Sequence, residues 1–238
     1  MDAGLHIVGT PIGNLADVSA RALDTLRAAT AVVAEDTRVT RRLLQRHGIS
    51  APLISCHKFS EAARADEIAR RAAREPIALV SDSGMPGLSD PGARIVRACR
   101  AAGVRIVVVP GPSAVTAALA LSGFTADRFT FGGFLPSHGQ ARRRSLEVLL
   151  GRDETIVLFE SPHRIRKLAE ELAGLAPTRP VCLAREMTKL FEESFVALGA
   201  DLPARLAAHP PRGEYTVVIA PSSGEPQPEV DRAEGGPD

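Results

Sequence analysis

The sequence predicts an α/β protein made of two α/β domains, with a parallel sheet in the N-terminal domain and a mixed sheet in the C-terminal domain. Short β-branched runs alternate with helical patterns as far as about residue 121, the rhythm of a parallel sheet covered by helices on both faces. Ile77–Val80 and Val104–Val109 are apolar throughout, as expected of strands buried on both faces. After Gly123 a second series begins whose last strands lie close together in the chain, which favours a mixed sheet.

The first domain is expected to span residues 1–121. Its expected strands are Leu5–Val8, Ala31–Ala34, Pro52–Ser55, Ile77–Val80 and Val104–Val109. Its expected helices are Val18–Ala28, Arg38–His47, Glu61–Arg74, Ala93–Ala102 and Ser113–Leu121. Gly48 stands where a helix commonly ends on a glycine, which supports the end of the second helix.

The second domain is expected to span residues 122–222. Its expected strands are Phe129–Leu135, Thr155–Phe159, Val181–Arg185, Phe195–Leu198 and Tyr215–Ala220. Its expected helices are Arg142–Leu150, Arg164–Leu172 and Ala204–Ala207. Residues 223–238 are rich in Pro, Gly and acidic residues and contain one valine, so we expect a disordered acidic tail.

Composition limits the classes of function. The formal net charge is only +1, so any nucleic-acid site has to be a local patch of basic residues. The three cysteines, Cys56, Cys99 and Cys182, lie far apart and outside any CxxC pattern, which predicts a reducing cytoplasm and no metal site. No signal peptide precedes Leu5, and no apolar run approaches the ~18 residues of a membrane span. We therefore expect a soluble cytoplasmic protein.

Four strand ends in the first domain carry unusual backbone chemistry. They are "GTPIGN" (9–14), "EDTR" (35–38), "SDSGMPGLSDPG" (81–92) and "PGPSA" (110–114). In open parallel sheets, ligands bind outside the carboxyl ends of the strands. Glycine allows close approach of the backbone to a ligand, and proline stiffens the adjacent loop. Although such loops are common after strands, four from a single sheet favour a site that binds a small molecule through backbone groups.

Two familiar phosphate-binding motifs are absent. The chain has no P-loop pattern, and no G-x-G-x-x-G, because Gly9 and Gly13 lie four positions apart with Pro11 between them. However, Glu35 and Asp36 end the second strand, where a ribose-binding acidic residue lies in dinucleotide-binding folds. A nicotinamide-dependent oxidoreductase is therefore an alternative, weakened by the missing fingerprint.

The motifs "TPIGNL", "AEDTR", "SDSGMPGLSDPG", "PGPSA", "GFLP", "FESPHR", "AREMTK" and "GEY" follow one another between residues 5 and 220. Together they resemble the tetrapyrrole-methylase superfamily and, through "TPIGNL", "EDTR" and "ESPHR", its ribosomal RNA small-subunit methyltransferase I branch. The resemblance implies two α/β domains with S-adenosylmethionine (SAM) in the cleft between them, and a homodimer. It also implies methylation of the ribose 2′-hydroxyl of a cytidine in the decoding region of 16S rRNA.

The resemblance also implies site residues. The cofactor-binding candidates are Pro11, Ile12, Gly84, Met85, Pro86, Leu88, Ser113, Ala114, Phe159 and Thr216. The catalytic candidates are Asp36, Arg38, Glu160, His163, Arg164, Glu186 and Lys189, although His163 and Arg164 fit equally the first turn of a helix capped by Ser161. Relatives usually have a threonine where this chain has Met85. Many continue into a small basic helical module after the second domain, so docking of RNA is expected to rely on the two core domains.

Two groups of arginines are candidate RNA contacts. Arg38, Arg42 and Arg46 recur every four residues on one expected helix, where like charges repel by a few tenths of a kcal/mol per pair unless an anion such as phosphate binds. Arg142, Arg143 and Arg144 form the second group. The alternative for both groups is an ordinary solvated helix face. Two further functions stay open, namely methylation of a tetrapyrrole or other small acceptor, and SAM binding without catalysis.

Overall fold

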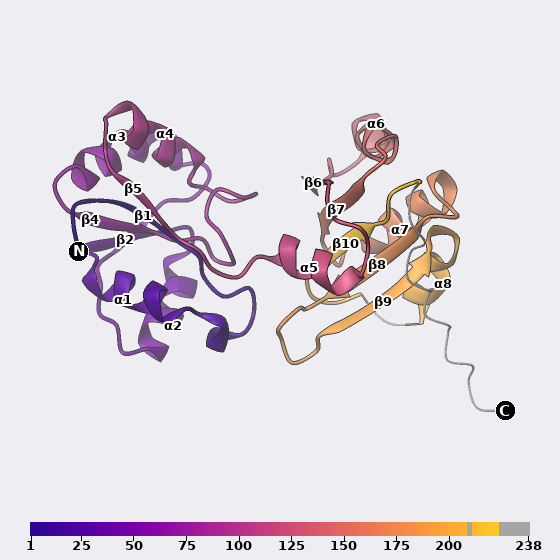
Figure 1. Ribbon diagram of the computed structural model, residues 1–238, viewed down its shortest axis with the longest axis horizontal. Helices are drawn as coiled ribbons and strands as arrows, with labels where there is room; N and C mark the ends of the chain where they lie inside the picture. The colour runs from indigo at the N-terminus through magenta and orange to yellow at the C-terminus, as the bar shows by residue number, and fades with distance from the viewer. Residues whose placement is uncertain (209–210, 224–238) are drawn as a thin grey trace. The chain divides into compact units, whose positions relative to one another are not determined.

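A computed structural model describes residues 1–208 and 211–223. The chain divides into two compact units, Met1–Ser113 and Ala114–Asp238, and each holds one five-stranded sheet (Figure 1). The division lies before α5 (Ala114–Ser122), because this helix packs against strands of the second unit, whereas the sequence placed it at the end of the first domain. The predicted tail lies outside the described residues except for Ser223, whose backbone N–H donates to Asp153 Oδ1 at 2.9 Å.

The first unit is built on a parallel sheet, as predicted. Its strands are β1 (Gly4–Val8), β2 (Ala31–Ala34), β3 (Leu53–Ser55), β4 (Pro76–Leu79) and β5 (Ile106–Val109). They lie in the order β3-β2-β4-β1-β5, and every neighbouring pair is parallel. The carboxyl ends of all five strands therefore meet at one edge of this sheet.

Helices cover both faces of the parallel sheet. They are α1 (Ala20–Ala28), α2 (Thr37–Arg46), α3 (Glu61–Ala72) and α4 (Ala93–Ala101), together with the short 3-10 helix η1 (Leu15–Asp17). Helices α1 and α2 cover one face and α3 and α4 the other (Figure 1). Each face has its own apolar cluster, because successive strand residues point to opposite faces: Ala31 and Val33 join the α3/α4 side, while Val32 and Ala34 join the α1/α2 side.

The second unit holds a mixed sheet, which confirms the prediction for this domain. Its strands are β6 (Phe129–Phe134), β7 (Thr155–Glu160), β8 (Pro180–Arg185), β9 (Glu193–Leu198) and β10 (Tyr215–Ile219). The order is β6-β7-β10-β8-β9, with β6 and β7 parallel and the other neighbouring pairs antiparallel. This arrangement makes β8 run in the same direction as β7.

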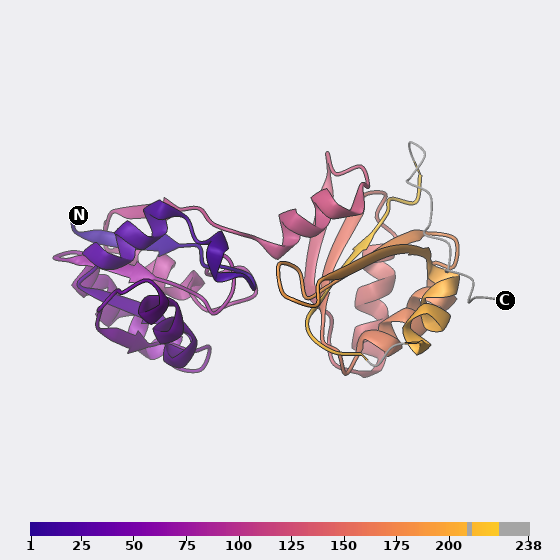
Figure 2. The same cartoon turned by 90° about the horizontal axis from the view of Figure 1, so that it is seen from below.

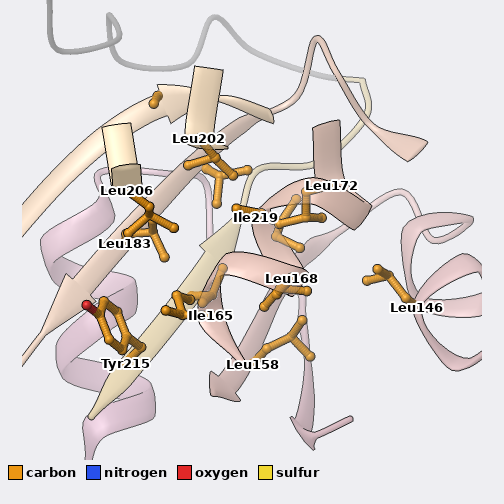
Figure 3. Close-up of a cluster of buried hydrophobic side chains, with 14 of the residues drawn as sticks. Leu146, Leu158, Ile165, Leu168, Leu172, Leu183, Leu202, Leu206, Tyr215 and Ile219 are labelled. Carbon is orange, nitrogen blue, oxygen red and sulfur yellow. The ribbon is translucent and has the colours of Figure 1, made fainter. Parts of the chain in front are cut away.

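The helices of the second unit are α5, α6 (Gly139–Leu150), α7 (Ile165–Leu175) and α8 (Leu202–Ala207), with the 3-10 helix η2 (Gly199–Asp201) before α8. Leu168 and Leu172 of α7 and Leu206 of α8 pack on the sheet residues Leu158 and Leu183 to form the core (Figure 3). Helix α5 lies against the other side of the sheet, on β10 and β8 (Figure 2). Within the described ranges, no helix is long and apolar enough to cross a membrane.

Candidate functional site

The four Gly- and Pro-rich segments of the first unit follow four neighbouring strands. The order β2-β4-β1-β5 places the segments 35–38, 81–92, 9–14 and 110–113 side by side at the carboxyl edge of the sheet. This is the edge at which open parallel sheets bind ligands. The sheet order thus brings together residues that are as much as a hundred positions apart in the chain.

Direct hydrogen bonds fasten the segments after β1 and β4 to each other. The Thr10 N–H donates to the Gly84 carbonyl oxygen at 2.9 Å. The Thr10 hydroxyl donates to the carbonyl oxygens of Ser81 at 3.1 Å and Gly84 at 3.3 Å. Gly84 has φ +74°, in the left-handed region that favours glycine, so this residue type allows the turn that Thr10 holds.

Gly9 and Gly111 allow the segments after β1 and β5 to touch. A Cβ atom at Gly9 would lie 2.6 Å from Gly111 N and 2.7 Å from the Met85 sulfur, and one at Gly111 would lie 2.8 Å from the Gly9 carbonyl carbon. These glycines therefore serve contacts within the chain. The Met85 side chain lies against Gly9, so Met85 packs on this group of loops.

Glu61, a residue that sequence reasoning missed, holds the far end of the 81–92 segment. It is the first residue of α3 and is only 7% exposed. Its Oε1 atom accepts hydrogen bonds from the N–H groups of Gly92 at 2.9 Å and Arg94 at 2.7 Å. Helix α4 has no side-chain cap of its own, so Glu61 supplies the acceptor that its first turn lacks. The signal in the sequence was only an acidic residue before a helical pattern, which does not identify this partner.

Four carboxyl groups gather where β2 and β4 end. The Asp36 N–H donates to Asp82 Oδ1 at 2.9 Å. Burial, followed by the nearby charges of Asp90, Asp82 and Asp36, raises the pKa of Glu35 to about 7. Burial likewise raises the pKa of Asp90 to about 6 and moves the pKa of Asp82 upward. This edge therefore contains groups that exchange protons near neutral pH.

Asp36 differs from these three acidic residues. Its carboxylate caps α2 by accepting the Arg38 N–H at 2.8 Å, and it pairs with the Arg38 guanidinium at 2.6 Å. The hydrogen bond from the Arg38 side chain lowers the pKa of Asp36 to about 2. Asp36 and Arg38 thus lie together at the start of α2, and Asp36 is a weak base.

In the second unit, three of the motifs meet at one edge of the mixed sheet. Tyr215, the first residue of β10, is in register with Glu160 at the end of β7 and with Arg185 at the end of β8. The segments that follow β7 and β8 and the one that precedes β10 therefore lie next to one another. This places "ESPHR", "EMTK" and "GEY" together, although the sequence separates them by more than 20 residues.

Glu160 is the centre of a buried ionic network. Its Oε1 atom accepts from the Ser161 N–H and from Arg164 Nε, both at 2.8 Å, and its Oε2 atom accepts from Arg142 Nη1 at 3.0 Å. Arg142 also pairs with Glu171 at 2.8 Å. The Arg142 and Glu160 side chains have no exposed surface, which corrects the prediction that Arg142 contacts RNA: phosphate does not reach it.

Glu186 and Lys189 form a second, more exposed ionic cluster with Glu214. Lys189 Nζ lies 2.8 Å from both Glu186 Oε1 and Glu214 Oε2, and Glu186 Oε1 also accepts the Glu214 N–H at 2.9 Å. Burial opposes ionisation of Glu186, but these hydrogen bonds outweigh it and hold the pKa of Glu186 below its usual value. Glu186 (φ +50°) and Thr188 (φ +65°) adopt the left-handed region, which is costly for residues with a Cβ.

The remaining candidates of the second unit vary in accessibility. His163 is exposed and lies before α7, which begins at Ile165 instead of at Arg164. Phe159 contacts the Phe131 ring at 5.0 Å and the Phe134 ring at 5.6 Å between ring centroids. Its register partner Thr216 is buried at 4% exposure, so any contact of Thr216 with a ligand requires its backbone or a small opening.

The basic stripe on α2 is present as predicted. Arg38, Arg42 and Arg46 are all exposed. Among the described residues, Arg41, Arg42 and Arg46 have no ion-pair partner, whereas Arg38 is held by Asp36. On α6, Arg143 pairs with Glu147 at 2.8 Å and Arg144 is exposed. On α2, therefore, Arg41, Arg42 and Arg46 are available to an external anion.

The described residues can be compared with what the predicted cofactor requires. Gly84, Met85 and Pro86 lie at the carboxyl edge of the first unit, beside Ile12 and Pro112, as a Cβ built on Gly84 would lie 3.4 Å from Ile12 Cγ2 and from the Pro112 carbonyl oxygen. These segments offer backbone groups and apolar contacts, which suit the adenine ring and the methylene groups of SAM. In the part of the chain that the structure describes, no group of three or more His, Cys, Asp or Glu side chains is placed to hold a metal ion.

Comparison with known proteins gives a consistent family match. Residues 4–203 match the model for tetrapyrrole (corrin/porphyrin) methylases. Ribosomal RNA small subunit methyltransferase I of Xylella fastidiosa is 45% identical over 90% of this chain and 80% of its own length. The proteins of the same name from Thermotoga maritima and Escherichia coli O157:H7 are 43% and 42% identical, over 91% and 90% of this chain and 97% and 77% of their own lengths.

Solved structures support the fold. Diphthine synthase matches with a TM-score of 0.68 at 19% identity, covering 91% of this chain and 89% of that chain. Uroporphyrin-III-C-methyltransferase from Thermus thermophilus matches with a TM-score of 0.63 at 21% identity, covering 92% and 94%. These likenesses concern the fold alone.

Proposed function

Since the chain belongs to the tetrapyrrole (corrin/porphyrin) methylase family and to its ribosomal RNA small subunit methyltransferase I branch, we propose that it methylates the ribose 2′-hydroxyl of a cytidine in the decoding region of 16S rRNA. The observation that carries this proposal is identity above 40% to proteins of that name over about nine-tenths of the chain. The unpaired arginines of α2 support an RNA substrate over a tetrapyrrole or other small acceptor.

We propose SAM as the methyl donor. When bound, SAM supplies a methyl group made electrophilic by the positively charged sulfur. In the first unit Pro11, Ile12, Gly84, Met85, Pro86, Leu88 and Ser113 would hold it, and in the second Ala114, Phe159 and Thr216. The hydrogen bonds of Thr10 to Gly84 and the packing of Gly9 on Gly111 keep these first-unit loops in a fixed geometry before any ligand arrives. Such preorganisation reduces the entropy lost on binding.

A ribose hydroxyl is a poor nucleophile, so the reaction needs a group that takes its proton. Of the carboxyl groups beside the cofactor loops, Glu35 has a pKa of about 7, the nearest to neutral pH, whereas those of Asp90 and Asp36 are about 6 and about 2. We therefore propose Glu35 as the proton acceptor. In this scheme Arg38, held by Asp36, binds a phosphate of the substrate.

The second unit contributes a rigid edge. Glu160 and Arg164 fix the start of the "ESPHR" segment, and Arg164 Nη1 also donates to the Leu135 carbonyl oxygen at 3.1 Å, which ties this segment to the end of β6. We propose that Glu160 and Arg164 position His163, which is exposed and available to the substrate, and that Glu186 and Lys189 shape the neighbouring segment. A cytoplasmic homodimer is also proposed, on the resemblance to the family.

The deciding experiment is mass spectrometry of small-subunit rRNA from cells with and without this protein. Loss of one 2′-O-methylcytidine in the decoding region, restored by the purified protein with SAM, is the expected result. Calorimetric titration with SAM and with NAD separates the methyltransferase from an oxidoreductase, because only one of the two is expected to bind. Unchanged rRNA together with tight SAM binding would instead favour a small acceptor or binding without catalysis.

A further inference from the structure

An aromatic side chain projects into solvent from the turn between β3 and α3. Phe59 has an exposed fraction of 91%, the highest of any large apolar side chain in the described part of the chain. Its neighbours His57 and Lys58 are also exposed. A fully exposed phenylalanine contributes nothing to the protein's own core, so the Phe59 ring is available to an external partner.

The turn that presents Phe59 is held by several hydrogen bonds. The Ser60 hydroxyl accepts from the His57 N–H and donates to the His57 carbonyl oxygen, both at 3.1 Å. The N–H groups of Ser60 and Glu61 also donate to the His57 carbonyl oxygen, at 2.9 Å and 3.0 Å. The His57 ring packs edge-on against Phe59, with 6.2 Å between ring centroids. Phe59 is therefore presented by an ordered turn.

This turn lies beside the start of the basic helix. Strand β3 is the parallel neighbour of β2, so the turn after β3 and the start of α2 after β2 meet at the same sheet edge. The Cys56 N–H continues the pairing by donating to the Ala34 carbonyl oxygen at 2.8 Å, and α2 packs against β3. Lys58, like Arg42 and Arg46, has no ion-pair partner among the described residues. Lys58, the residue next to Phe59 in the chain, therefore brings an unpaired positive charge to this turn, whereas Arg46 lies at the other end of α2.

We propose that Phe59 stacks on one unstacked base of the RNA substrate while Lys58 contacts an adjacent phosphate; this inference rests on the proposed rRNA methyltransferase function. Aromatic side chains bind splayed-out bases in single-stranded loops of RNA, and cationic neighbours bind the backbone. The positive charge of Lys58 beside Phe59 favours a polyanion over a second copy of this chain, whose net charge is +1. One exposed aromatic ring suits the recognition of a single nucleotide within a structured RNA.

The test uses the full chain and small ribosomal subunits purified from cells that lack this protein. Phe59→Ala and Phe59→Leu are expected to weaken binding by about 5- to 150-fold, because base stacking on an aromatic ring is lost, while Phe59→Trp retains it. Phe59→Leu is the matched control, since it keeps an apolar side chain without the ring. Lys58→Gln is expected to reduce the slope of log affinity against log salt by about 0.7, whereas Phe59→Ala leaves the slope unchanged.

Wild-type affinity of Phe59→Leu would overturn the proposal, because it would show an apolar contact without stacking. A change of molecular mass by light scattering in Phe59→Ala would also overturn it, in favour of contact with a second copy. Failure of the proposed function looks different: the wild-type protein itself would then transfer no methyl group to the subunits. Calorimetric SAM affinity, expected to be equal in all variants, shows that each variant is folded.

Discussion

Arg142 Nη1 lies 3.0 Å from Glu160 Oε2, and neither side chain has any surface exposed to solvent. Arg142 comes from the first turn of α6 and Glu160 from the end of β7, so this ion pair joins a helix to the sheet of the second unit. Arg142 Nη1 also donates to the Pro136 carbonyl oxygen at 3.3 Å. The pair therefore fixes the segments that follow both β6 and β7.

The first prediction concerns this pair. Arg142→Ala should reduce the free energy of unfolding by about 3–5 kcal/mol, because it leaves the Glu160 carboxylate buried beside one partner fewer. Urea denaturation followed by circular dichroism measures the change. Arg144→Ala, an exposed neighbour on the same helix, is the control and should stay within about 0.5 kcal/mol of wild type. Equal stability of the two variants would contradict the assigned role of Arg142.

Arg142 also shows where sequence reasoning stops. Three consecutive arginines look alike, and which one faces inward depends on where the helix starts and on carboxylates elsewhere in the chain. Helix α6 begins at Gly139, before the expected Arg142, and the partners Glu160 and Glu171 lie on other elements. The local sequence pattern shows neither where the helix starts nor which carboxylates lie beside it.

The fold itself was predictable because its signals are local. The β-branched runs and their turn residues identify every strand of both sheets to within about two residues, and Ala31–Ala34 is predicted without error. The candidate loops follow from one general rule about parallel sheets. By contrast, the contact of Glu61 with Gly92 and the clustering of Glu35 with Asp82 and Asp90 depend on tertiary packing. These groups became visible only in the structure.

The second prediction concerns Glu61. Glu61→Gln retains one acceptor oxygen but loses the charge that stabilises the start of α4, and Glu61→Ala loses both. We expect losses of about 0.5 and about 1–2 kcal/mol in the free energy of unfolding. Because Glu61 holds the end of the 81–92 segment, SAM affinity measured by calorimetry should fall in the same order. Glu67→Ala, an exposed site on the same helix, is the control and should change neither quantity appreciably.

The third prediction concerns the pH dependence of stability. The pKa of Glu35 is about 7 in the folded chain against an ordinary value of 4.5, so the folded state binds this proton more tightly. Stability contributed by this group therefore falls as pH rises from about 4.5 to 7. Glu35→Gln should raise the free energy of unfolding by about 1 kcal/mol at pH 8 and leave it unchanged at pH 4. The value at pH 8 is kept small because Glu35 is partly solvated. Thermal melting at both pH values measures the difference.

Activity provides a fourth, separate prediction for the same residue. If Glu35 accepts the hydroxyl proton, the methylation rate of the wild type rises with pH to a plateau with a midpoint near 7, and Glu35→Gln is slower by about 10²- to 10⁴-fold. Asp36→Asn is the control. Because the pKa of Asp36 is about 2, the methylation rate of this variant should still rise with pH to a plateau. Its midpoint should lie at a lower pH than in the wild type, because one negative charge near Glu35 is lost. A Glu35→Gln variant with the wild-type pH profile would exclude this role.

The fifth prediction tests the basic stripe on α2. Arg42→Glu with Arg46→Glu should weaken binding to small ribosomal subunits strongly at low salt and lower the slope of log affinity against log salt by about 0.7 for each lost phosphate contact. SAM binding should survive, because both side chains lie on α2 beyond the 35–38 segment.

Arg97→Glu with Arg100→Glu on α4 is the matched control. It makes the same change in charge on the opposite face of the sheet, and Arg100, like Arg46, lies in the last turn of its helix. Each double variant therefore carries the same cost of placing an acidic residue at a helix C-terminus. If both double variants lost the same affinity, net charge alone would explain the loss, and if the α2 variant bound as the wild type does, α2 would be a solvated face. Weaker binding confined to the α2 variant would identify this helix as an RNA contact.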